Sequence, residues 1–202
     1  MRAAVCIYDW FCNFEISAIL ETMHFAGIKT DFMSKTTTPV RCEEGMLAVP
    51  EMTWKEANAE DYDILILPGI GAEDDSADWI LADEDLLNLI REFNAKKKWI
   101  AAISVAPMIL MSAGIMENRT FTASVPREVF MPNGGCTTVS FTAEQLKNMI
   151  DINDLEQYEG LDVVISDHII TANAWHYREW ACEISKVLEI DFPYGTFGLE
   201  KR

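Results

Sequence analysis

Ser104 lies between two apolar stretches of the sequence. The first, Trp99–Ile103, is short and predicts a buried strand, and the second, at residues 105–113, predicts a helix that ends at Gly114. A small polar residue in a single turn between strand and helix is the position of the nucleophile in a nucleophile elbow. Serine is also a common helix N-cap, and because no G-x-S-x-G motif is present, the residues alone favour that structural role.

Strand and helix patterns alternate along the chain around Ser104. Strands are predicted at residues 3–8, 29–34, 63–67, 99–103, 161–166 and 169–173, and helices at 13–27, 83–97, 105–113 and 175–188. This alternation predicts a three-layer α/β sandwich with a largely parallel sheet. Because ligands bind such sheets beyond the carboxyl ends of the strands, we expect the loops at 9–15, 68–71 and 104–105 to meet there.

Local signals predict caps and turns. Asn13 and Asp83 precede helical patterns and are expected to be N-caps. The sequences Thr-Trp-Lys-Glu at 53–56 and Thr-Ala-Glu-Gln at 142–145 are capping boxes, and the first predicts a short helix. Gly45, in the middle of residues 41–50, predicts a hairpin. The tail at 191–202 is expected to be irregular.

Composition limits the class of protein. The 202 residues, half of them hydrophobic, predict one domain over 1–202 with its core at about 3–188. The net charge of −17 disfavours nucleic acid and anionic membranes as partners. No apolar run has the length of a membrane span, and the N-terminus does not resemble a signal peptide. The five cysteines form no C-x-x-C pair, which predicts reduced thiols and the cytoplasm.

Motifs in a fixed order give the sequence a family resemblance. They are Tyr8-Asp9 followed by Phe14-Glu15, the stretch Tyr62-Asp-Ile-Leu-Ile-Leu-Pro-Gly69, the stretch Ile100-Ala-Ala-Ile-Ser-Val-Ala-Pro107, and Ile170-Thr-Ala-Asn173. In this order the sequence resembles the DJ-1/PfpI (ThiJ/PfpI) superfamily, which is related to class I glutamine amidotransferase domains. The resemblance extends over residues 3–188 and implies a flavodoxin-like fold and a homodimer, for which the hairpin at 41–50 is one candidate surface.

The resemblance also implies roles for individual residues. Ser104 falls on the elbow nucleophile, which is normally cysteine in the family, and Glu15 falls on the acid that hydrogen-bonds it. Gly69 and Ile70 fall where backbone N–H groups form the oxyanion hole, although many members have two glycines there. Val105 stands where protease- and amidase-like members often carry histidine. Residues 122–126 also lack the histidine that another branch keeps there.

A serine hydroxyl needs a partner base, whereas cysteine is partly thiolate at neutral pH. A helix terminus contributes about 1 kcal/mol, or around one pKa unit, which is too little to ionise serine. Glu15 becomes a base only if burial raises its pKa. His176 beside Trp175 is the alternative base, although both residues are expected first to fill the corner after the last strand. Cys12 could also face the pocket, but an incidental loop cysteine is the simpler interpretation.

The remaining histidines suggest no chemistry: His24 is expected at a helix boundary and His168 in solvent at a hairpin tip. No cluster has metal-ligand spacing, so neither a metal nor a cofactor is expected. We therefore expect a non-catalytic or weakly active member that binds a small-molecule ligand. The alternative is a Ser104-dependent small-molecule hydrolase, hydratase or amidase. Peptidase activity is the weakest hypothesis because Val105 replaces the histidine that it needs.

Overall fold

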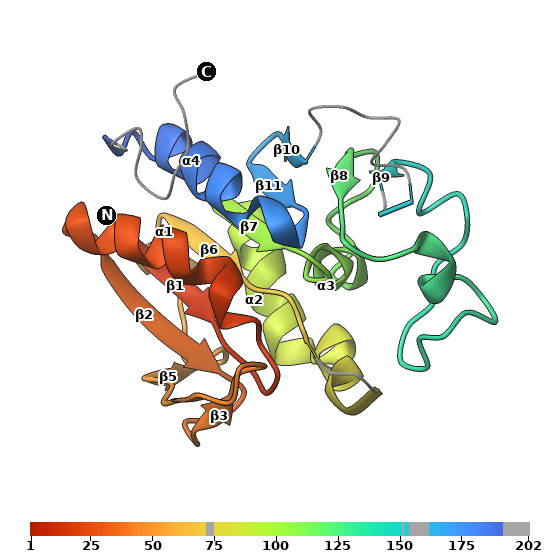
Figure 1. The fold of residues 1–202 in the computed structure, drawn as a ribbon, viewed down its shortest axis with the longest axis horizontal. Helices are drawn as coiled ribbons and strands as arrows, with labels where there is room; N and C mark the ends of the chain where they lie inside the picture. The colour runs from red at the N-terminus through yellow and green to blue at the C-terminus, as the bar shows by residue number, and fades with distance from the viewer. Residues whose placement is uncertain (72–74, 151, 154–161, 192–202) are drawn as a thin grey trace.

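The computed structural model describes residues 1–71, 75–150, 152–153 and 162–191. A seven-stranded sheet runs through its centre in the order β10-β11-β7-β6-β1-β2-β5 (Figure 1). Its strands are β1 (Arg2–Cys6), β2 (Lys29–Ser34), β5 (Met52–Thr53), β6 (Ile64–Leu67), β7 (Trp99–Ile103), β10 (Val163–Ser166) and β11 (Ile169–Ala172). All neighbouring strands are parallel except the β10–β11 hairpin. The predicted mostly parallel α/β fold is therefore confirmed.

Four helices cover this sheet in the described part of the chain: α1 (Asn13–Phe25), α2 (Glu84–Ala95), α3 (Pro107–Ser112) and α4 (Tyr177–Val187). Helices α1 and α4 pack against each other on one face, and α2 and α3 lie on the other (Figure 1). The central strands β6 and β7 have almost only buried side chains, because helices cover both of their faces.

Shorter elements lie outside the seven-stranded sheet. They are the β3 (Val40–Arg41) and β4 (Leu47–Ala48) hairpin, the β8 (Phe121–Thr122) and β9 (Met149–Ile150) pair, and the 3₁₀ turns η1 (Ala59–Asp61), η2 (Asp75–Ala82), η3 (Arg127–Phe130) and η5 (Ala174–His176). The hairpin predicted around Gly45 is confirmed, and Gly45 has a positive φ of 91°. The tail beyond residue 191 lies outside the described residues.

Helix starts follow the sequence signals only in part. The side chain of Asp83 accepts from the Leu86 N–H and caps α2 as predicted. The prediction for Asn13 was wrong, because Asn13 is already the first residue of α1 and Cys12 is the N-cap, without a side-chain cap. Glu44 of the β3–β4 hairpin caps α1 instead, and its carboxylate accepts from the Phe14 N–H at 2.8 Å. A long-range contact has replaced the local one.

The two capping boxes form without a helix behind them. The Glu56 carboxylate accepts from the Thr53 N–H at 2.8 Å, and the Gln145 side chain accepts from the Thr142 N–H at 2.9 Å. Both segments continue as turns, so the short helix predicted after Thr53 was wrong. A capping box satisfies backbone donors at the start of a turn, but a helix also needs residues with which to propagate.

The strand order reverses between β1 and β6. From β1 the chain crosses over to β2 on one side, and from β6 it crosses to β7 on the other. At such a reversal the connecting helices leave on opposite faces, and the loops after β1 and β6 lie at the carboxyl edge, where they pair with each other. No helix in the described part of the chain is long and apolar enough to cross a membrane.

Candidate functional site

Ser104 follows β7 directly and has a φ of 63°. Its N–H donates to the Ala172 carbonyl at 2.9 Å, and its own carbonyl accepts from the Ser124 N–H at 3.0 Å. These two bonds hold a backbone conformation that costs about 1–2 kcal/mol for a residue with a Cβ. The helix expected from Val105 begins only at Pro107, so Ser104 and half-buried Val105 belong to the turn between strand and helix.

Glu15 approaches Ser104 from the first turn of α1. Its side chain is only 1% exposed, and its Oε2 accepts from the Gly69 N–H at 2.5 Å. Burial raises the pKa of Glu15 from 4.5 to about 7, although hydrogen bonds from the Gly69 N–H, the Ser104 hydroxyl and the Cys12 thiol oppose this shift. A carboxyl with such a pKa can exchange a proton near neutral pH.

Gly69 lets these two side chains meet. A Cβ on Gly69 would lie 2.6 Å from the Ser104 Cβ, 2.7 Å from its Oγ and 2.8 Å from Glu15 Oε2. Any other residue would therefore push Ser104 and Glu15 apart. The Gly69 N–H, expected as an oxyanion donor, points at Glu15 instead. The Ile70 N–H makes no hydrogen bond to another described residue.

His176 and Trp175 follow β11 but do not complete a triad with Ser104. His176 Nε2 lies 3.5 Å from Asp162 Oδ2, and its buried Nδ1 has no hydrogen-bond partner among the described residues. Trp175 is 73% exposed and stacks on Phe14 with ring centroids 5.9 Å apart. The indole of Trp175 is therefore mostly in solvent and does not fill a pocket at Ser104.

The other two histidines lie away from Ser104. His168 was predicted to be in solvent, but it is only 6% exposed. Its Nε2 lies 3.1 Å from Asn94 Oδ1 and its Nδ1 3.0 Å from Asp167 Oδ2, and burial lowers its pKa below 6.5. The prediction was wrong because α2 covers the hairpin tip, which a local pattern does not reveal. His24 is exposed near the end of α1.

Three neighbours of Glu15 carry further chemistry. The buried Cys12 thiol contacts both Glu15 and Glu43, and burial and these carboxylates raise its pKa far above its usual range, so it acts as a donor. The buried Tyr8 hydroxyl donates to the Pro68 carbonyl, which fixes the β6 loop. Sequence reasoning missed the contacts of Glu43 and Tyr8, since no spacing links a hairpin acid or a tyrosine after β1 to Glu15.

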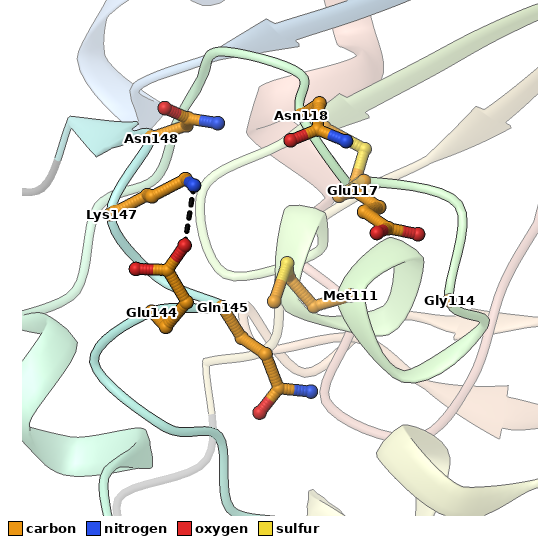
Figure 2. A pocket seen from close by; sticks show the side chains of 9 residues that line it. Met111, Gly114, Glu117, Asn118, Glu144, Gln145, Lys147 and Asn148 are labelled. Atoms are coloured by element: carbon orange, nitrogen blue, oxygen red, sulfur yellow. Dashed lines mark hydrogen bonds and ion pairs between the residues drawn. The ribbon is translucent and has the colours of Figure 1, made fainter.

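A cavity of about 320 Å³ lies elsewhere, between the end of α3 and residues 144–148 (Figure 2). Met111 and Met116 are its apolar lining side chains, and the other lining side chains are mostly polar. Its lysine, Lys147, is already paired with Glu144 at 2.5 Å. None of the residues around Ser104 lines it. In the described part of the chain, no group of three His, Cys, Asp or Glu side chains could hold a metal ion.

Comparison with known proteins identifies the family. The family model "DJ-1/PfpI family" matches residues 1–186, and the chain belongs to this family. An uncharacterized protein of Methanocaldococcus jannaschii is 31% identical over 181 residues, which cover 87% of this chain and 75% of that protein. A glutathione-independent glyoxalase of Caenorhabditis elegans is 26% identical over 166 residues, or 81% of this chain and 75% of the glyoxalase.

Other relatives extend the comparison. A protein/nucleic acid deglycase of Escherichia coli is 26% identical over 136 residues, which cover 66% of this chain and 77% of the deglycase. The crystal structure of a DJ-1 superfamily protein of Agrobacterium tumefaciens has a TM-score of 0.74 at 17% identity, covering 96% of this chain and 92% of that one. Oxidized DJ-1 of Toxoplasma gondii has a TM-score of 0.70 at 20% identity, covering 93% and 90%. These two similarities show the flavodoxin-like fold alone.

Proposed function

We propose that this chain binds a small carbonyl compound of the glyoxal type at Ser104 and Glu15, and releases it unchanged or converts it only slowly. One observation carries the proposal: the titratable group next to the Ser104 hydroxyl is the buried carboxyl of Glu15, whose pKa is about 7. Neither ring nitrogen of His176 bonds the hydroxyl. The ligand class follows from the glyoxalase and deglycase names of two relatives.

The chemistry of serine supports binding over turnover. In this proposal Ser104 stands at the nucleophile elbow, where family members carry cysteine. A thiol is a few per cent ionised at neutral pH and adds readily to an aldehyde, whereas a hydroxyl needs a base in the transition state. Ser104 and the Ile70 N–H then hold the carbonyl oxygen of the ligand by hydrogen bonds, and Val105 lines the turn beside it.

In this proposal the affinity for the ligand depends on the protonation state of Glu15. When Glu15 is ionised, its carboxylate accepts the Ser104 hydroxyl proton and competes with the ligand oxygen. When Glu15 is protonated, this competition ends and the hydroxyl is free to donate. Because the pKa of Glu15 is about 7, we expect affinity for a neutral carbonyl compound to fall as pH rises through neutrality.

Glyoxal labelled with ¹³C tests this proposal, because NMR follows the bound ligand and any glycolate formed by its hydration. We expect saturable binding to the wild type with glycolate at background. Ser104→Cys should produce glycolate at least about tenfold faster than wild type, because it restores a thiol to an intact frame. Saturable binding in neither protein would contradict the ligand class, and Ser104→Ala is the control for reaction at surface lysines and arginines.

A Ser104-dependent hydrolase, hydratase or amidase is the second candidate. It is favoured by the same pKa, since a buried carboxyl near neutrality is suited to general-base catalysis. A fluorophosphonate, which labels activated serines covalently, separates the two. Labelling of Ser104 that disappears in Ser104→Ala and Glu15→Gln would replace the binding function with the catalytic one. An unlabelled Ser104 would retain the binding function.

For partners, we propose a homodimer through the β3–β4 hairpin, in the cytoplasm. The hairpin region exposes Met46, Leu47 and Val49 at 51–65%, and Trp10 nearby is 39% exposed. Apolar side chains gathered in this way mark association surfaces. Light scattering after gel filtration should give twice the chain mass for wild type and the monomer mass for Leu47→Glu. A monomeric wild type would contradict the proposal.

A further inference from the structure

Two glycines after β6 face the same side of the chain. The segment 69–71 runs antiparallel to residues 10–12: the Cys12 N–H donates to the Gly69 carbonyl at 3.1 Å, and the Gly71 N–H donates to the Trp10 carbonyl at 2.8 Å. In an extended segment, residues two apart point to the same face. The missing side chains of Gly69 and Gly71 therefore leave two adjacent spaces.

A carboxyl group fills each of these spaces. A Cβ on Gly69 would lie 2.8 Å from Glu15 Oε2, and a Cβ on Gly71 would lie 2.6 Å from both Cγ and Oε2 of Glu43. Because Gly69 and Gly71 are only two residues apart, the two carboxyl groups lie on the same side of this segment. Glu43 is held in this position because its N–H donates to the Phe11 carbonyl at 3.0 Å.

Cys12 lies opposite Gly69, to whose carbonyl its N–H donates at 3.1 Å, and its thiol interacts with both carboxyl groups. A thiol has one proton to donate, so the two carboxyl groups compete for it. We propose that Glu43 is a positioning residue of the Glu15 centre, because it draws the Cys12 proton toward itself and keeps the proton of Glu15 in place. Glu43 is exposed and needs no contact with a ligand for this role.

The charges around Glu15 act in opposite directions. The Glu43 charge raises the pKa of Glu15, whereas donation from Cys12 lowers it. Gly69 and Ser104 also lower it, and the Tyr8 hydroxyl facing Glu15 donates to Pro68. Because the Glu43 side chain reaches solvent, its influence should weaken with salt.

The test is a titration of Glu15 followed by NMR on protein labelled with ¹³C at the glutamate carboxyl, with Glu15→Gln assigning the signal. No ligand is added, so this result stands or fails separately from the binding function. In Glu43→Gln the midpoint of Glu15 should fall by about one pH unit at low ionic strength, and less at high salt. In Cys12→Ala it should rise, and Cys12→Ser should restore most of the wild-type value.

Two variants distinguish this role from a general charge effect. Gly71→Ala displaces Glu43 while leaving the charge on the hairpin, and should lower the Glu15 midpoint as Glu43→Gln does. Glu44→Gln removes a charge from the same hairpin at the cap of α1, and should lower the midpoint much less. Equal shifts for Glu43→Gln and Glu44→Gln, or no shift for Glu43→Gln, would overturn the proposal.

Discussion

Glu15 and His168 are two buried titratable side chains at opposite edges of one sheet. Glu15 lies beyond the carboxyl end of β6 with a raised pKa, and His168 precedes β11 at the other edge with a lowered pKa. Burial favours the neutral form of both groups. Their partners make the difference between them.

The polar groups around His168 are also bonded to one another. Asn94 Oδ1 lies 3.1 Å from both His168 Nε2 and Arg119 Nη1, and Arg119 also pairs with Asp167 at 3.1 Å. Arg119 and His168 are thus both tied to Asn94 and Asp167 by short polar contacts, which is typical of a structural site. Glu15 instead accepts from the Gly69 N–H and interacts with a hydroxyl and a thiol, two side chains that can also bond other partners. A buried titratable group therefore indicates function only when its partners are exchangeable.

Of the substitutions that test the difference between the Glu15 and His168 sites, Glu15→Gln should change the free energy of unfolding most. Since the folded-state pKa is raised from 4.5 to about 7, Glu15 contributes its full stability below pH 4.5 and loses roughly 3 kcal/mol as pH rises through 7. Glutamine does not titrate, so the stability of the variant relative to wild type should increase by this amount. Urea unfolding of both proteins at pH 5 and pH 8 measures it, and an unchanged difference would contradict the burial of a titrating carboxyl.

His168→Ala should cost about 2 kcal/mol, because it removes one of the two groups bonded to Asn94 Oδ1 and opens a space in the core. The lowered pKa gives this contribution the opposite pH dependence: it is complete above pH 6.5 and is lost as pH falls through the folded-state value. The difference in unfolding free energy between wild type and variant should therefore shrink from pH 7.5 to pH 5.5. His24→Ala, at an exposed site, is the control and should change little.

Ser104→Gly should have the smallest effect, a gain of about 1 kcal/mol, because glycine adopts the observed φ of 63° without strain. Ser104→Ala keeps the backbone strain and removes only the hydroxyl, so it should not show this gain. Thermal unfolding of the two variants measures the difference. An equal gain in both would mean that the strain at the carboxyl edge is not in the backbone of Ser104.

Much of the fold was predictable from local patterns. The strands β2 and β7 have the predicted bounds, and Asp83 caps α2 through a contact three residues away. The predictions at Asn13 and after Thr53 failed for non-local reasons. Glu44, a distant residue, caps α1 in place of Asn13, and the turn after Thr53 is not continued as a helix. The loops at 9–15, 68–71 and 104–105 meet as expected, because parallel strands bring their carboxyl ends to one edge.

Local sequence patterns were enough to predict the alternation of strands and helices, the turn that carries Ser104, and an acid in the first turn of α1. These are consequences of periodicity and of contacts within a few residues. Only the tertiary structure decided that Glu15 is buried with a pKa of about 7, that Glu43 and Cys12 lie beside it, and that His168 is enclosed. Protonation depends on every group within a few ångströms, and here those groups come from segments far apart in the chain.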